Sequence, residues 1–244
     1  MGKVGKVAEL VRHPVKALRG ESLQECRVDS FGLYGDRSHY FGDGTKEGRP
    51  LSPDKCPSFI EYTARFIGDG TEEAYPPVEV TSPSGDTFTW GEASFFAEME
   101  KAAKLPIMPF SRTPMEGGEN WDGHILIVTD ASLRELQKAW GKGVVDHRRF
   151  RANVVIALDA DQPFQEDEWL GKRLQIGEVT LQVNSHCERC HAINIDPANY
   201  EIDTSLLKTV VKSRENRFGV YATVVQTGSI RVDDEVHVVA ESVK

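Results

Sequence analysis

The chain has 244 residues, of which 39% are hydrophobic and 27% are charged, and its formal net charge is −9. This length allows one large domain or two small ones with a sizeable hydrophobic core. The negative charge repels phosphate at long range, so we expect binding neither to nucleic acid nor to a membrane. An anionic ligand would need a local basic pocket, for which the candidates are Lys16, Arg19, Arg37, Arg148, Arg149 and Arg151.

The N-terminal segment "MGKVGKVAELVRHPVKALRG" interrupts each short apolar run with a charged residue or a histidine. It therefore lacks the apolar region of a secretory signal, and no other stretch is apolar for long enough to span a bilayer. We expect a cytoplasmic protein whose four cysteines are reduced thiols.

The first part of the chain predicts mainly strands. In residues 59–67, "FIEYTARFI", alternation places Ile60, Tyr62, Ala64 and Phe66 on one face of a strand. Residues 78–90, "VEVTSPSGDTFTW", predict a hairpin that turns at residues 84–86. Residues 92–105 have helical spacing after a possible cap at Ser94, and they predict the first helix.

The polar segment 111–124, "SRTPMEGGENWDGH", is expected to be a linker or a mobile loop. We therefore divide the chain into a β-rich N-terminal module, residues 1–110, and a second domain, residues 111–244. In the second domain, residues 129–140 predict a helix capped at Thr129 or Asp130 and ended by Gly141. Residues 203–213 predict a weaker helix, residues 173–184 a hairpin turning at Gly177, and residues 220–239 three short strands.

Residues 186–191 read "HCERCH" and allow several chemistries. The pattern C-x-x-C-H fits covalent haem attachment, which normally takes place outside the cytoplasm. Zinc would usually require a second ligand pair, whereas Cys26 and Cys56 are widely separated. A thioredoxin-like dithiol requires a helix N-terminus, whereas the "HAINIDP" that follows alternates like a strand. A single thiolate offered to a soft metal and a pair of buried structural cysteines remain as further alternatives.

An ordered set of motifs resembles one family over nearly the whole chain. "HPVKALRGESLQECRV" and "GLYGDR" resemble the start of the N-terminal β-barrel module that precedes MOSC domains (molybdenum cofactor sulfurase C-terminal domains). "ILIVTDASL", "RRFRANVVI", "EDEWLGKRLQIGEVTL", "CERCHAINIDP" and "RFGVYATVVQTGSIRVDDEV" follow in the order of the MOSC pattern. The layout is similar to that of the mitochondrial amidoxime-reducing component and of bacterial reductases of N-hydroxylated bases.

The resemblance implies a mainly β fold with a few helices, in which a β-barrel-like MOSC domain follows the N-terminal β-rich module. It also implies a molybdenum cofactor, in which molybdenum is carried by molybdopterin. Cys190 would be the metal ligand and the catalytic residue. Lys16, Arg37, Arg151 and Asn153 would contact the pterin or its phosphate, for which Arg, Lys and amide side chains are well suited.

The implied activity is the reduction of N-hydroxylated or N-oxide small molecules. The chain has no dinucleotide fingerprint and no iron-sulfur set of cysteines, so we expect an external electron donor, either a reductase or a ferredoxin-like protein. Asp122, His124 and His186 are candidates for delivering protons. The alternative function is a non-enzymatic carrier of the cofactor, or of a persulfide on Cys190.

The sequence departs from the family pattern in three of these motif regions. Ala17 follows Lys16 where relatives often have a small hydroxyl residue, and Ala152 replaces a proline. Asp122 and Gly123 stand where the reductases tend to have a Thr-Ser pair. These departures affect positions that are expected to lie beside the cofactor.

Overall fold

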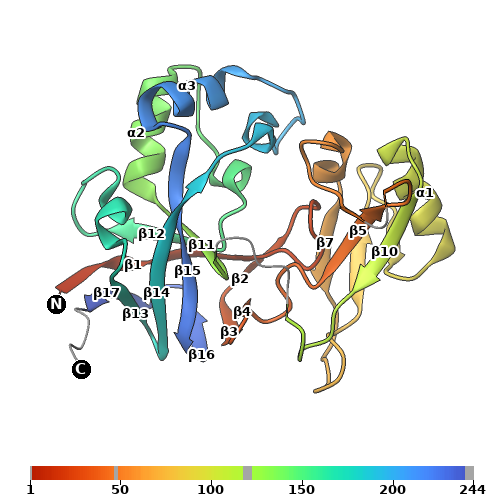
Figure 1. Ribbon diagram of the computed structural model, residues 1–244, viewed down its shortest axis with the longest axis horizontal. Helices are drawn as coiled ribbons and strands as arrows, with labels where there is room; N and C mark the ends of the chain where they lie inside the picture. The colour runs from red at the N-terminus through yellow and green to blue at the C-terminus, as the bar shows by residue number, and fades with distance from the viewer. Residues whose placement is uncertain (1, 47–48, 118–122, 240–244) are drawn as a thin grey trace.

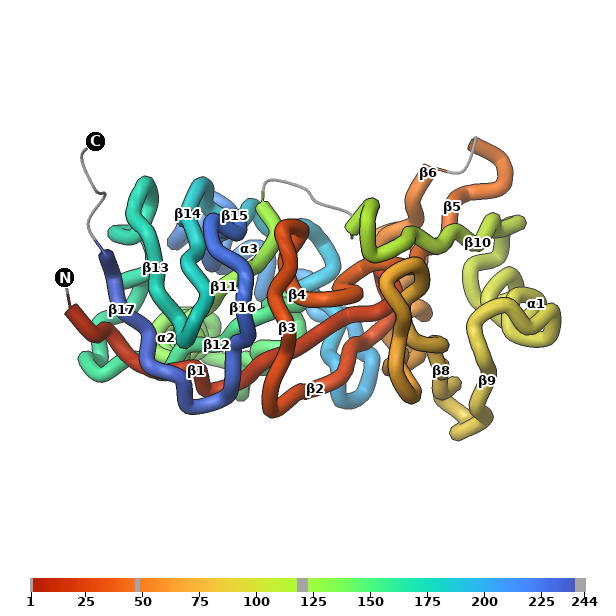
Figure 2. Tube along the Cα trace, turned by 90° about the horizontal axis from the view of Figure 1, so that it is seen from below, coloured from red at the N-terminus to blue at the C-terminus, as the bar shows by residue number. Residues whose placement is uncertain are grey.

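The computed structural model describes residues 2–46, 49–117 and 123–239. Two β-rich bodies lie along its long axis, and β1 (Gly2–Arg12) runs from the outer edge of the larger body toward the smaller one (Figures 1 and 2). The mainly β fold with a few helices is thus confirmed.

The larger body is a closed barrel of seven strands in the order β12-β11-β15-β14-β13-β17-β1, and β1 pairs with β12 to close it. Neighbouring strands are antiparallel except for β11 and β12, which are parallel and joined through a helix. Besides β1, the barrel strands are β11 (Ile125–Thr129), β12 (Val154–Leu158), β13 (Arg173–Ile176), β14 (Val179–Glu188), β15 (Arg217–Gln226) and β17 (Glu235–Val239).

Shorter strands build the rest of the molecule. The strand β2 (Glu21–Leu23) pairs with the end of β1. Three small sheets hold the others: β3 (Glu25–Asp29), β4 (Gly32–Leu33) and β16 (Gly228–Arg231); β5 (His39–Asp43), β6 (Arg49–Pro50) and β10 (Ile107–Ser111); and β7 (Thr63–Phe66), β8 (Val78–Thr81) and β9 (Thr87–Thr89).

The expected boundary at residue 110 stays a prediction, and hydrogen-bonded sheets cross it. The first strand, β1, belongs to the barrel formed by strands after residue 111, and β3 pairs with β16. The first 30 residues therefore contribute to both bodies. Residues 118–122 of the expected linker lie outside the described residues.

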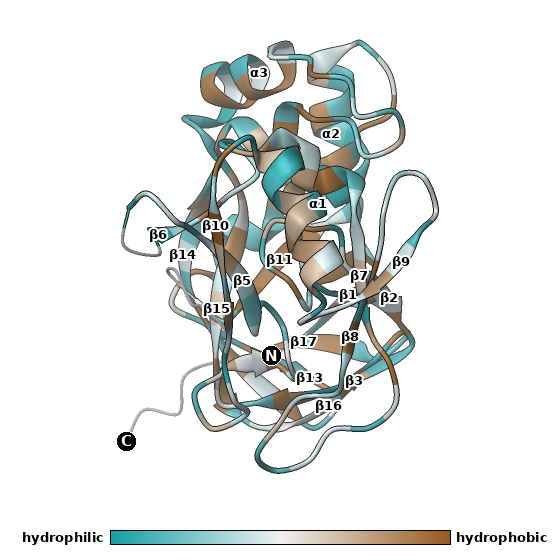
Figure 3. Ribbon diagram, turned by 90° about the vertical axis from the view of Figure 1, so that its right-hand side faces the viewer, coloured by the Kyte–Doolittle hydropathy of each residue, from teal (hydrophilic) through white to brown (hydrophobic). Residues whose placement is uncertain are grey.

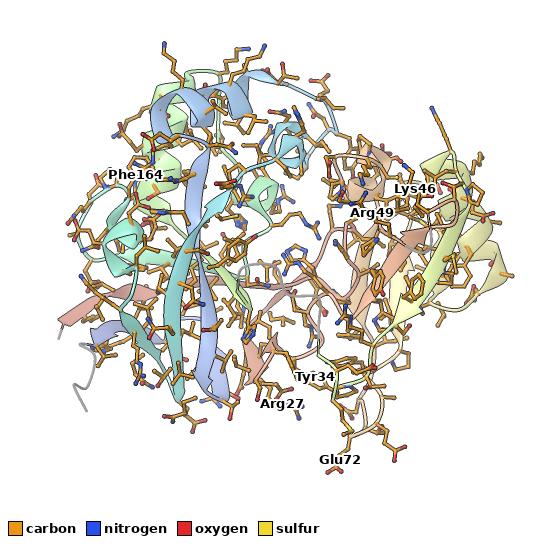
Figure 4. All side chains as sticks on the ribbon, viewed as in Figure 1. Arg27, Tyr34, Lys46, Arg49, Glu72 and Phe164 are labelled. Carbon is orange, nitrogen blue, oxygen red and sulfur yellow. The ribbon has the colours of Figure 1, made fainter. Side chains whose placement is uncertain are left out.

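The three predicted helices are present as α1 (Ala93–Ala103), α2 (Asp130–Trp140) and α3 (Ser205–Arg214). The Thr129 side chain caps α2 by accepting from the Ser132 N–H, and Gly141 ends this helix at φ 70°. The predicted cap of α1 is wrong, because Glu92 precedes the helix without a side-chain cap bond and Ser94 lies within the first turn. Figure 3 shows both hydrophobic and hydrophilic residues along α3, and its buried residues, Leu206 and Val210, are four positions apart, as expected for a helix with one buried face.

Four 3₁₀ helices complete the described elements: η1 (Pro57–Glu61), η2 (His147–Phe150), η3 (Gln165–Trp169) and η4 (His191–Asn194). Two of them correct predicted strands. Residues 59–61 belong to η1, which starts at Pro57, and the strand begins only at Thr63. The predicted burial of Ile60, Tyr62 and Ala64 is nevertheless confirmed. Residues 191–194 form η4 rather than a strand.

The other predicted strands are confirmed. The hairpins β8–β9 and β13–β14 turn where expected, and residues 217–239 form β15, β16 and β17. Three buried clusters support these elements, one inside the barrel, one in the smaller body, and one between the barrel and the helices α2 and α3. Within the described ranges no helix is long and apolar enough to cross a bilayer.

The cap of α2 belongs to a buried polar cluster. The Thr129 hydroxyl accepts from the Ser132 N–H at 3.3 Å and lies 2.9 Å from Glu166 Oε2. We expect Thr129→Val to lower the free energy of unfolding by about 2 kcal/mol, because it removes a cap and leaves a buried carboxyl with one partner fewer. Urea denaturation measures this change. Ser94→Ala is the matched control and should change the free energy by less than about 0.5 kcal/mol, so an equal loss in both variants would contradict the role of the cap.

Candidate functional site

The two cysteines of "HCERCH" lie in different environments. Cys187 is near the end of β14 and is 3% exposed, whereas Cys190 precedes η4 and is exposed. All four cysteines are free thiols. His186 and Cys187, adjacent in the strand, differ in burial as expected, with His186 Nε2 3.2 Å from Asp167 Oδ1. Of the two thiols, only that of Cys190 is open to a ligand.

An arginine holds each side of the Cys190 segment. Arg149 is buried, donates through Nη1 to the Ile193 carbonyl at 3.2 Å, and forms an ion pair with Asp196. On the other side, Arg189 donates to Cys187 Sγ at 2.7 Å and to the Phe150 carbonyl at 2.7 Å. These contacts tie η4 and the end of β14 to η2, so the position of Cys190 is fixed from both sides.

Three of the predicted cofactor residues contact one another directly. Arg37 Nη1 lies 3.3 Å from Asn153 Oδ1, and Arg37 Nη2 donates to the Arg151 carbonyl at 3.1 Å. Asp36 forms an ion pair with Arg37. Although 116 residues separate Arg37 and Asn153 in the chain, the fold brings them together.

Asn153 is 1% exposed, and backbone groups use most of its amide. Its Oδ1 accepts from the Leu126 N–H at 3.1 Å, and its Nδ2 donates to the Val11 carbonyl at 3.2 Å. Its contact with the cofactor stays a prediction. The observed bonds give it a positioning role, because they join β1, β11 and β12 and orient Arg37.

Arg151 directly follows η2, and its carbonyl accepts from Arg37. Its Nη1 donates to the Leu18 carbonyl at 2.6 Å, and its Nη2 is buried without a hydrogen-bond partner among the described residues. Burial and the nearby charge of Arg37 lower the pKa of Arg151 to about 9, whereas the charges of Asp36 and Cys190 act in the opposite direction. Arg149 and Phe150 of η2, which directly precedes Arg151, contact the segment on either side of Cys190.

Lys16 is buried, and three residues at or near the candidate site have a left-handed backbone conformation. Lys16 is 6% exposed, and its N–H donates to the His39 carbonyl at 2.8 Å. Ala17, Arg37 and Arg151 all have a positive φ, of 75°, 52° and 55°. Residues with a Cβ adopt this conformation at a cost of roughly 1–2 kcal/mol, and such residues gather at functional sites.

Sequence reasoning missed His13 and Asp36. The Asp36 carboxylate accepts from the His13 N–H at 2.7 Å, and the His13 carbonyl accepts from the Arg37 N–H at 2.6 Å. His13 opens the quoted motif "HPVK", and Asp36 directly precedes Arg37 in "GDR", so each stood beside a predicted residue. The sequence could not indicate the role of Leu18, because Leu18 contacts Arg151 through its backbone carbonyl and not through its side chain.

The residues proposed to deliver protons, His124 and His186, have different hydrogen-bond or ion-pair partners. His124 Nδ1 accepts from the Val224 N–H at 3.2 Å, and burial lowers the pKa of His124. Asp122 lies outside the described residues. Within the described part of the chain, no group of three or more His, Cys, Asp or Glu side chains is arranged to hold a metal ion.

Two family models match the chain. The model described as the MOSC domain matches residues 113–237, just over half of the chain, and the model described as the MOSC N-terminal beta barrel domain matches residues 4–85. The chain belongs to the MOSC domain family. The barrel that carries Cys190 is thus the MOSC domain, completed by β1 from the N-terminal segment.

Named relatives of this MOSC protein include reductases and sulfurases. The mitochondrial amidoxime reducing component 2 of Bos taurus is 28% identical over 96% of this chain and 83% of its own length. Its Homo sapiens counterpart is 35% identical over 46% of this chain and 36% of its own length. The molybdenum cofactor sulfurase of Drosophila mojavensis is 37% identical over 39% of this chain, but the match spans only 12% of that protein.

A solved structure shares the overall fold of this chain. The YUAD protein from Bacillus subtilis superposes with a TM-score of 0.55, covering 98% of this chain and 97% of its own, at 13% sequence identity. At that identity the likeness concerns the fold alone.

His13 provides a test of the site's electrostatics. Burial, followed by the charges of Arg151 and Arg37, holds the pKa of His13 well below its usual 6.5. The unfolded chain therefore takes up a proton near pH 6.5 while the folded chain does not. The corresponding stability is complete above pH 6.5 and is lost as the pH falls toward the folded pKa, by at most about 1.4 kcal/mol per pH unit.

We expect the ring signals of His13 in an NMR titration to stay those of neutral imidazole from pH 7.5 to 5.5. In His13→Gln, the free energy of unfolding should fall less between pH 6.5 and 5 than in the wild type. A midpoint near 6.5 for His13 would contradict the burial argument.

Proposed function

We propose that this MOSC protein binds a molybdenum cofactor through Cys190 and reduces N-hydroxylated or N-oxide compounds with electrons from a separate donor protein. One observation carries the proposal: the exposed Cys190 thiol lies on a segment that is tied to η2, and Arg151, directly after η2, has a buried Nη2 with no hydrogen-bond partner among the described residues. Similarity to the amidoxime reducing component of Bos taurus over 96% of the chain supports the reductase class.

The residues present fit such a cofactor. A thiolate is a suitable ligand for a soft metal, and the guanidinium forks of Arg37 and Arg151 match the acceptor oxygens of a phosphate. The unpartnered Nη2 of Arg151 is the donor that an anionic group would satisfy. Ala17 offers no hydroxyl, so the Lys16 loop would contribute through its backbone and through the lysine.

Each residue has a distinct task in this proposal. Cys190 would ligate the metal from a segment that Arg149 and Arg189 hold in place. Arg151 would bind the anionic part of the cofactor, Arg37 would join it, and Asn153 would keep Arg37 oriented. When bound, the molybdenum cofactor supplies the two-electron redox chemistry that no side chain offers.

The cysteines give the first test. We expect protein made in a host that synthesises molybdopterin to contain molybdenum and pterin near stoichiometry. Cys190→Ala should lose the molybdenum, because it removes the exposed thiol. Cys187→Ala is the matched control and should retain it, because that thiol is buried against Arg189. Metal analysis and the fluorescence of oxidised pterin measure both, and absence of pterin from all three proteins would overturn the proposal.

The arginines give the second test. Arg37→Ala should lower the pterin content at least about tenfold, because a charge-assisted hydrogen bond is worth roughly 1.5–3 kcal/mol. Arg65→Ala is the control, since Arg65 lies on the surface in an ion pair with Glu79. Equal pterin content in the two variants would contradict a role for Arg37.

A measurement of substrate reduction distinguishes the proposed reductase from a protein that only carries the cofactor. Loaded protein should reduce an N-hydroxylated amidine when an artificial electron donor is supplied. Loaded protein that leaves such substrates unchanged but transfers its cofactor to a recipient would favour the carrier function instead.

A further inference from the structure

A cavity of about 190 Å³ lies beside the proposed cofactor site. Its lining comes from the end of β1, the loop before β2 and β2 itself, η1, the start of β7, η2 with the residues after it, and the residues after η4. Six basic side chains line it, and its described lining contains no carboxylate: His13, Arg19, His147, Arg148, Arg149 and Arg151.

The charges around this cavity are only partly compensated. Arg148 pairs with Asp146, and Arg149 pairs with Asp196. Arg19 and Arg151, in contrast, donate only to backbone carbonyls, those of Glu61 at 2.9 Å and Leu18 at 2.6 Å. Neither forms an ion pair with a described residue, so two guanidinium charges of the lining lack a carboxylate partner.

Buried donors in the lining also lack partners. His13 is 4% exposed, and neither of its ring nitrogens, one a donor and the other an acceptor in the neutral ring, has a hydrogen-bond partner among the described residues. The same holds for Nε of Arg19 and of Arg149. Buried polar groups nearly always have a partner, and leaving one unsatisfied costs about 1–3 kcal/mol. Donors gathered around one cavity therefore indicate a ligand rich in acceptor oxygens.

We propose that this cavity binds a phosphate-type oxyanion. A tetrahedral dianion offers several acceptor oxygens, which matches a lining of guanidinium and imidazole donors. At about 30 Å³ for each water, the cavity has room for roughly six, which is enough for a phosphate group together with water or a short ester chain.

This site differs from the proposed cofactor site. Arg151 lines the cavity, whereas Cys190, Lys16, Arg37 and Asn153 do not. The anion would thus contact Arg19, a residue of the loop between β1 and β2, and His13, whereas Nη2 of Arg151 is the donor assigned to the cofactor. Phosphate could also reach these donors as the terminal phosphate of the cofactor, and the experiment distinguishes the two sources.

Inorganic phosphate is the probe, titrated calorimetrically into the full chain against chloride at equal ionic strength. We expect one phosphate per chain, with an affinity lowered at least tenfold in Arg19→Gln and unchanged in Arg65→Gln. Lys16→Gln, on the cofactor side, should bind phosphate like the wild type. Protein loaded with cofactor should also bind phosphate.

Three outcomes overturn the inference: no phosphate binding by the wild type at millimolar concentration, equal affinity in Arg19→Gln and the wild type, or a tenfold loss in Lys16→Gln alone. Phosphate bound by the cofactor-free protein but not by the loaded protein also overturns it, because the cavity then belongs to the cofactor. Circular dichroism of each variant shows that it is folded. The wild-type titration does not depend on the proposed function, so the two can fail separately.

Discussion

The side chain of Asn153 is the interaction on which the arrangement of the site depends. It stands one residue before β12, where β1, β11 and β12 meet, and its amide takes the place of backbone partners for Leu126 and Val11. Burying an amide is unfavourable unless its hydrogen bonds are satisfied, so these contacts fix the side chain in one orientation. The remaining lone pair of Oδ1 faces Arg37, and the closure of the barrel thereby determines where that guanidinium lies.

The side chains of Arg37 and Arg151 are held close to each other although their like charges repel. Arg37 is neutralised by Asp36, whereas Arg151 is kept in place by the carbonyl of Leu18 and by its own left-handed backbone. The strain at these positions is tolerated because every neighbouring segment is anchored elsewhere in the fold. A site that gathers positive charge in this way is stabilised when an anion binds, which is the common basis of both proposed ligands.

Local patterns predicted the elements, but not which of them meet. The Thr129 cap, the stop at Gly141 and the hairpin at Gly177 follow from a few neighbouring residues, and all are present. The 3₁₀ helix at 57–61 was missed because its apolar residues alternate as they would in a strand. The same residues are buried in a tight turn that starts at Pro57. The pairing of β1 with β12 joins residues about 150 apart, and no local period contains that information. The individual site residues came from the family motifs, whereas the burial of Asn153 and the role of His13 required the fold.

The same distinction explains the cysteine pair. A C-x-x-C spacing suggests two equivalent thiols, yet the pairing of β14 with β15 shifts register between His186 and Glu188, and η4 begins directly after Cys190. Cys187 therefore faces the cluster under α2 and α3, while Cys190 emerges where the strand has ended. One cysteine is a packed residue bound by Arg189, and the other is an exposed thiol on a segment held in place from both sides. A metal that needs one protein thiolate suits this geometry, whereas a metal that needs both would have to pull Cys187 out of the core.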